Sequence, residues 1–121
     1  MNIELLEEYI EELKDTLKEG LISTSIFSQE DGISIAEYNI TAHSNLAYNS
    51  ITNYTLKKFR DSNLSNIDKY MIFSLENDVI LVIIPLYNYR WAILVDNNKI
   101  KLGVLLNMII PNTRKKFKTI L

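Results

Sequence analysis

Residues 79–87 (VILVIIPLY) form the longest apolar run of the sequence, with nine residues. A membrane-spanning helix needs about 20 apolar residues, so we expect no transmembrane segment. An almost uniformly aliphatic run of this length predicts a central β-strand, either covered on both faces or with one deeply buried face. Because Pro85 has no amide proton to donate to a sheet, we expect the strand to stop there.

The segments before this run alternate between helical and extended patterns. Over residues 6–17, apolar residues recur at spacings of three and four with acidic residues between them, which predicts an amphipathic helix ending at Gly20. Residues 21–28 and 33–36 flank Asp31 and Gly32, a dipeptide typical of hairpin turns. The helical period returns from residue 41 to residue 61.

Two more strands and a helix complete the predicted order. Residues 67–75 and 90–96 flank the aliphatic run, and residues 99–118 have a helical pattern. Pro111 should kink this last helix or split it, with Asn112 starting the second piece. The order predicts an α+β sandwich of one five-stranded antiparallel sheet with helices on both faces. No internal repeat or linker appears, so we expect a single domain over residues 1–121.

Residue composition argues against an enzyme. The chain has no cysteine, one histidine and three glycines. These counts remove thiol chemistry, multi-histidine metal sites and glycine-rich phosphate loops, so we expect no catalytic residue, metal or cofactor. His43 precedes a helical pattern without a cluster of partners, and we expect it to be solvated or to cap the helix.

Charge is close to balanced overall but uneven along the chain. The net charge is −2, which gives no support for binding to nucleic acid or an anionic membrane. Residues 1–19 contain seven acids, whereas residues 97–121 contain six basic residues and no acid. We therefore expect the first and last helices to lie side by side and attract. The start of the chain lacks the features of a secretory signal, which favours a cytoplasmic location.

Four segments together resemble the roadblock / dynein light chain family, which has a profilin-like fold. Residues 28–36 (SQEDGISIA) resemble the family's first hairpin, and the long helix follows. Residues 76–85 (ENDVILVIIP) resemble its buried central strand. Residues 91–96 (WAILVD), leading into residues 102–105 (LGVL), resemble its last strand and closing helix.

This resemblance implies a homodimer, or a heterodimer with a paralogue, that serves as a regulatory platform for small Ras-like GTPases and has no chemistry of its own. In the family, the middle helices of two subunits pack together and the strand after them pairs across the two-fold axis. The corresponding dimer surface would lie on the middle helix and the strand that follows it. Its residues would be Tyr48, Ile51, Thr52, Thr55, Phe59, Tyr70 and Ile72.

The middle helix also has a polar side. Its apolar residues, Ala47, Tyr48, Ile51, Tyr54, Thr55 and Phe59, fall within about 140° of arc, and this side is expected to pack. We expect the residues on the other side to be exposed to solvent. They are the candidate contacts to the GTPase: Asn49, Asn53, Lys57 and Arg60.

A second function of a different class stays open. A profilin-like sensor module would hold a small ligand or a peptide in a pocket beside the sheet. Ligand-induced stabilisation without any GTPase would mark this alternative.

Overall fold

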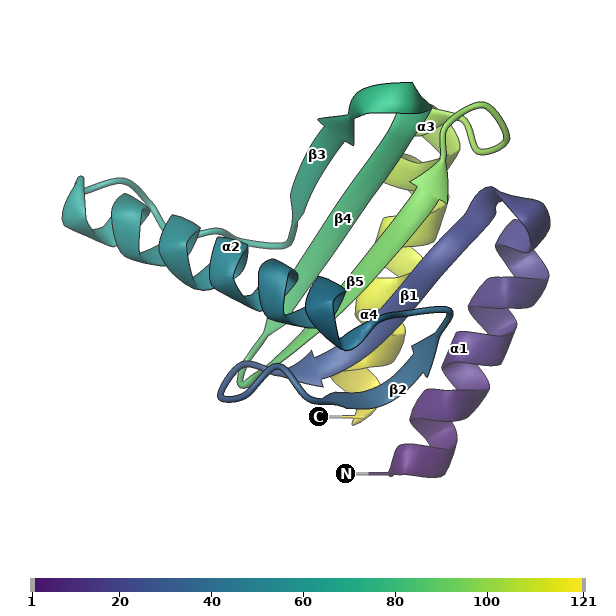
Figure 1. Ribbon diagram of the computed structural model, residues 1–121, viewed down its shortest axis with the longest axis horizontal. Coiled ribbons are helices and arrows are strands. Elements are labelled where there is room, and N and C mark those ends of the chain that lie inside the picture. Colours follow the sequence, from purple (N-terminus) through teal and green to yellow (C-terminus); the bar gives the residue numbers. More distant parts are fainter. Residues whose placement is uncertain (1, 121) are drawn as a thin grey trace.

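One antiparallel sheet, with strand order β2-β1-β5-β4-β3, organises the computed structural model (Figure 1). The structure describes residues 2–120 and all of their side chains except that of residue 42. The strands are β1 (Leu21–Ser28), β2 (Ser34–Tyr38), β3 (Met71–Leu75), β4 (Val79–Leu86) and β5 (Tyr89–Asp96). The helices are α1 (Ile3–Leu17), α2 (Ala42–Asp61), α3 (Leu102–Val104) and α4 (Ile110–Ile120), with a π-helical turn at Leu105–Ile109 and short 3-10 turns at Lys18–Gly20 and Glu76–Asp78. This is the α+β architecture predicted from the sequence.

The aliphatic strand β4 is covered on both faces. Ile80, Val82 and Ile84 belong to the larger core cluster, which also contains the buried residues of α1 and α4. Leu81 and Ile83, which alternate with them, belong to a smaller cluster on the α2 side of the sheet. Successive side chains of a strand point to opposite faces, so an uninterrupted apolar run is what a doubly covered strand requires.

Trp91 of β5 connects the sheet to helix α4 within the larger cluster. Its ring meets that of Phe117 edge to face, with centroids 5.7 Å apart. Its Nε1 donates a hydrogen bond of 2.8 Å to Oγ1 of Thr24, which in turn donates to the carbonyl of Ala92 at 2.8 Å. The buried indole therefore packs as an apolar residue while its one polar atom is satisfied.

The acidic first helix and the basic last helix lie together, as their charges predict. Lys116 of α4 forms an ion pair with Glu12 of α1, and its ammonium also lies 5.5 Å from the centre of the Tyr9 ring. Both helices cover the same face of the sheet, and α2 crosses the other face (Figure 1).

Pro85 explains two differences from the predicted strands. β4 continues through Pro85 to Leu86, but at Pro85 it pairs only with β5. β3 begins at Met71, opposite Ile83, rather than at residue 67. The same register continued would place Lys69 opposite Pro85, which has no N–H to donate, so pairing ends before that point.

The last helical segment is divided, as Pro111 predicts, but its second piece, α4, begins at Ile110 and not at Asn112, so Pro111 lies in the first turn of α4. The irregularity lies just before it, in the π-helical turn Leu105–Ile109. Proline removes one hydrogen bond and crowds the preceding turn, and a wider turn accommodates both effects. Among the described residues, no helix is long and apolar enough to cross a membrane.

Thr24→Val tests the hydrogen bonds around Trp91. Valine keeps the shape of threonine but leaves the buried Nε1 of Trp91 without its acceptor, so we expect a loss of about 1–3 kcal/mol in the free energy of unfolding. Urea unfolding followed by tryptophan fluorescence measures the loss. Thr16→Val, at an exposed threonine of α1, is the control and should change stability by less than about 0.5 kcal/mol. Equal stability of the two variants would contradict the role of Thr24.

Candidate interaction surface

Helix α2 meets the sheet through polar side chains. Asn45, Asn49 and Thr52 are spaced to lie along one side of the helix, and all three are buried. Ser25 of β1 donates a hydrogen bond of 2.6 Å to Oδ1 of Asn45, whose amide donates to Ser34 of β2. The contact between α2 and the sheet thus includes hydrogen bonds from buried polar side chains beside the apolar cluster that Tyr48 packs against.

A buried arginine lies at the centre of this contact. Arg90 of β5 is 2% exposed and donates from its guanidinium to Oδ1 of Asn49. Asn49 donates onward to the carbonyl of Gln29 at 2.8 Å, and Gln29 also accepts from Arg90 at 3.4 Å. Desolvation by burial lowers the pKa of Arg90, although arginine keeps its charge at any physiological pH. Among the described residues, Arg90 forms no ion pair, and its Nε has no hydrogen-bond partner.

The side of α2 that the sequence predicts to pack is exposed in the single chain at three apolar residues. Ile51 is 39% exposed and Tyr54 is 65% exposed, and Ala47 is exposed as well. Asn49, predicted to lie on the wet side and to contact a GTPase, is only 8% exposed. That prediction is wrong about where Asn49 lies, because the buried Arg90 requires its amide. The spacing of Asn45, Asn49 and Thr52, at four and three residues, was the sequence signal that could have predicted a buried polar side of α2.

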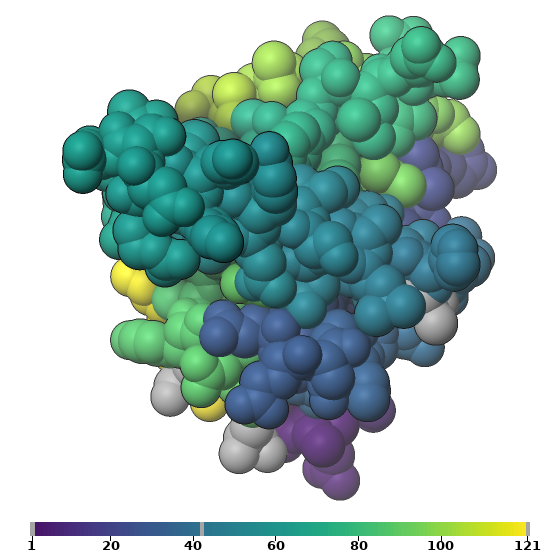
Figure 2. All heavy atoms as spheres, turned by 60° about the vertical axis from the view of Figure 1, so that its left-hand side comes forward, coloured from purple at the N-terminus to yellow at the C-terminus, as the bar shows by residue number. Residues whose placement is uncertain are grey.

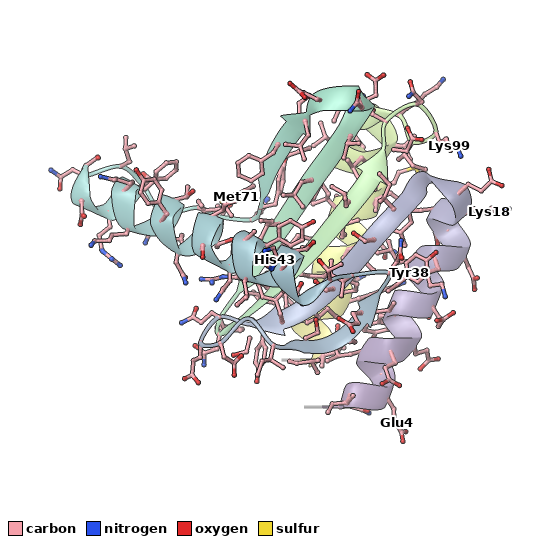
Figure 3. The ribbon with its side chains drawn as sticks, in the orientation of Figure 1. Glu4, Lys18, Tyr38, His43, Met71 and Lys99 are labelled. Carbon is pink, nitrogen blue, oxygen red and sulfur yellow. The ribbon has the colours of Figure 1, made fainter. Side chains whose placement is uncertain are left out.

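The other predicted contact residues stay on the outer surface. Asn53, Lys57 and Arg60 are all exposed on α2, which forms the front of the molecule in Figure 2. His43 is exposed in the first turn of the helix (Figure 3). The side-chain cap comes instead from Thr41, whose Oγ1 accepts from the amide of Ser44 at 3.2 Å.

The predicted dimer residues fall into four groups. Thr52 is fully buried in the single chain, and its hydroxyl donates to the carbonyl of Tyr48, one turn earlier in the same helix, at 2.8 Å. Tyr48, Thr55 and Phe59 are half-buried, and burial raises the pKa of Tyr48 against the opposing effect of its hydrogen bonds to Ser44 and Ser23. Ile51 is exposed.

Tyr70 and Ile72, by contrast, lie on the α1/α4 side of the sheet. Tyr70 packs against the larger cluster on that side, and Ile72 pairs with Val82, which belongs to the same cluster.

Strand β3 is one edge of the sheet and contains no charged residue. Helix α2 extends past this edge (Figure 1). Met71, at the start of β3 (Figure 3), belongs to the cluster against which Tyr48 of α2 packs. An uncharged strand edge with apolar side chains is a surface that pairs readily with another strand. We refer to the β3 edge together with the exposed apolar side of α2, Ala47, Ile51 and Tyr54, as the β3–α2 surface.

The structure offers little room for a small ligand between the helices. The hollow between α1 and α4, lined by Tyr9 and Trp91 among others, has a volume of about 20 Å³, which is room for roughly one water molecule. Among the described residues, no group of three or more acidic or histidine side chains is placed to hold a metal ion.

Comparison with known proteins shows the class of fold. No family model matches the sequence, and no curated protein matches it either. Among solved structures, the chain is similar to MglB of Myxococcus xanthus, with a TM-score of 0.82 and 10% identity over 98% of this chain and 89% of that one. It is also similar to a Roadblock/LC7 domain from Streptomyces avermitilis, with a TM-score of 0.66 and 11% identity over 84% and 85% of the two chains.

The fold of this chain is therefore the roadblock fold, as the sequence resemblance implied. Profilin IA of Acanthamoeba castellanii has a related fold, with a TM-score of 0.60 and 12% identity over 95% of this chain and 98% of that one. This similarity agrees with the profilin-like architecture expected from the sequence.

Asn49→Ala tests the polar contact beneath α2. The substitution removes the main acceptor for the buried guanidinium of Arg90, and we expect it to lower the free energy of unfolding by about 2–3 kcal/mol. Asn53→Ala, one turn further along the same helix and exposed, is the matched control and should cost less than about 0.5 kcal/mol. Chemical denaturation of both variants measures the difference. If the two losses were the same, Asn49 would not anchor the helix.

Proposed function

We propose that this protein is a non-enzymatic, dimeric, cytoplasmic regulator that binds a small Ras-like GTPase and modulates its nucleotide cycle. The observation that carries the proposal is the β3–α2 surface, an uncharged sheet edge beside an exposed apolar helix side, in a chain with the roadblock fold. The β3 edge and the apolar side of α2 are both exposed in the single chain, and each could pair with the same surface of a second copy.

Pairing of two β3 edges explains the exposed apolar residues. A two-fold contact uses the same patch twice, so one strand pair satisfies the free backbone groups of both copies. On the α2 side, the projecting helices would cover Ile51 and Tyr54 of each other. On the opposite side, Ile72, which is 37% exposed, would approach its counterpart.

The outward polar residues of α2 supply the proposed GTPase contact. Asn53, Lys57 and Arg60 remain exposed when the apolar side is covered, because they lie on other parts of the helix surface. Two such helices on one face of a dimer would dock beside the switch regions of a GTPase and favour one of their conformations. The chain has no glycine-rich phosphate loop, so the GTPase itself would supply nucleotide binding and the chemistry of hydrolysis.

Light scattering over a dilution series tests the dimer. We expect a mass near twice 14.1 kDa that persists at micromolar concentration. Ile51→Glu should raise the dimer dissociation constant at least about tenfold, because pairing would bury a charge. Ile33→Glu, at an exposed apolar residue before β2, is the control and should leave the mass unchanged. A monomeric wild-type protein would contradict the proposal.

The triple variant Asn53→Ala, Lys57→Ala, Arg60→Ala tests the GTPase contact. We expect about tenfold weaker binding in a titration with the GTPase, since several polar contacts are lost at once, together with an unchanged dimer mass. Ser50→Ala, at another exposed position of α2, is the control. Wild-type affinity in the triple variant would remove these residues from the contact and leave the dimer standing.

A further inference from the structure

The sheet has a second open edge. β2 lies at the end opposite β3 and, among the described residues, pairs only with β1. In an antiparallel pair, alternate residues of an edge strand direct their N–H and C=O groups away from the partner. The outer edge of β2 therefore presents backbone groups that can pair with an added strand.

A groove of about 590 Å³ follows this edge between β2 and α1. It is lined by four consecutive residues of β2, residues 34–37. Because the four residues are consecutive in an edge strand, the hollow follows the length of β2 beside its open edge. This α1–β2 groove extends about 10 Å along the strand, which is room for three or four residues of an extended chain.

The helical wall of the groove is acidic. Glu4, Glu7, Glu8 and Glu11 line it at spacings of three and four, which places them on one side of α1. Glu37 of β2 adds a fifth carboxylate. All five glutamates are exposed.

The cation near this groove is already engaged. Lys14 pairs with Glu11 at 3.2 Å, and its ammonium lies 4.5 Å from the centre of the ring of Tyr38, at the end of β2 (Figure 3). Among the described residues, the other four glutamates form no ion pair. The groove thus combines unpaired backbone groups with uncompensated negative charge.

We propose that the α1–β2 groove binds an extended segment of a partner protein that is rich in lysine and arginine, and that this segment adds to the sheet beside β2. Main-chain hydrogen bonds to the strand edge supply affinity, and the glutamates select cationic side chains. A second copy of the chain is a poor occupant, because two β2 edges would bring like charges together. The proposal goes beyond GTPase regulation and does not depend on it.

A fluorescent eight-residue peptide of alternating lysine and valine or threonine tests the proposal by anisotropy. We expect saturable binding that weakens as salt is added, because the charges are exposed. The same peptide with methyl groups on alternate backbone nitrogens keeps its charge but cannot pair as a strand. We expect at least about tenfold weaker binding of this methylated peptide, because its main-chain donors are lost.

Two charge-matched protein variants locate the binding. The first replaces Glu4, Glu7, Glu8 and Glu37 with glutamine, and should weaken binding about tenfold. The second makes four neutral substitutions at exposed acids that do not line the groove, and should bind as the wild type does. Its substitutions are Asp15→Asn, Asp61→Asn, Asp68→Asn and Glu76→Gln. Circular dichroism checks that both variants are folded.

Three results would overturn the proposal. No saturable binding at millimolar peptide would mean that the acidic residues only protect the edge from aggregation. Equal binding of the methylated peptide would show general charge attraction without strand addition. Equal weakening in both variants would mean that the peptide binds elsewhere. The dimer mass and the GTPase titration are read separately, so failure here leaves the proposed function untouched.

Discussion

The hydrogen bonds of Arg90 to Asn49 and Gln29 determine how α2 is oriented. A guanidinium buried in β5 without a carboxylate has to find neutral acceptors, and Asn49 is one of them. This requirement turns the polar side of α2, including Asn45 and Thr52, toward the sheet. Burying a charge without an ion pair is costly. The resulting orientation leaves the apolar side of α2 exposed to solvent. The proposed dimer depends on that outcome.

The fold was largely predictable from the sequence, because its patterns are local and agree with one another. The doubly covered strand β4 follows from the aliphatic run, and the first hairpin follows from Asp31 and Gly32. The ion pair between Lys116 and Glu12 follows from the opposite charges of the two ends. Pro85 and Pro111 were harder, because their effects depend on tertiary context. Pro85 is tolerated where β4 has lost its β3 neighbour, and Pro111 is tolerated in the first turn of α4, directly after the π-helical turn.

The candidate site was less predictable. Hydrophobic periodicity identifies a side of α2 that packs, but it does not show which side faces the sheet, and here Ile51 and Tyr54 are exposed while Asn49 is buried. The error at Asn49 follows from Arg90, which in the sequence stands beside a tyrosine-rich turn and gives no sign of being buried. Of the four predicted contact residues, Asn53, Lys57 and Arg60 are exposed and Asn49 is not. The side-chain pattern within one helix therefore does not show which side is buried against the sheet of its own chain.

The two edges of the sheet differ in chemistry, and the difference bears on how the molecule assembles. β3 has no charged residue, while the groove beside β2 has five glutamates. An uncharged edge can pair with its own copy, whereas an acidic edge repels its copy and attracts a cationic strand. If both edges were uncharged, copies could add at both ends and form an open array instead of a closed dimer. In the proposed assembly, the acidic groove would limit self-association to the β3 edge and leave β2 free for a partner of opposite charge.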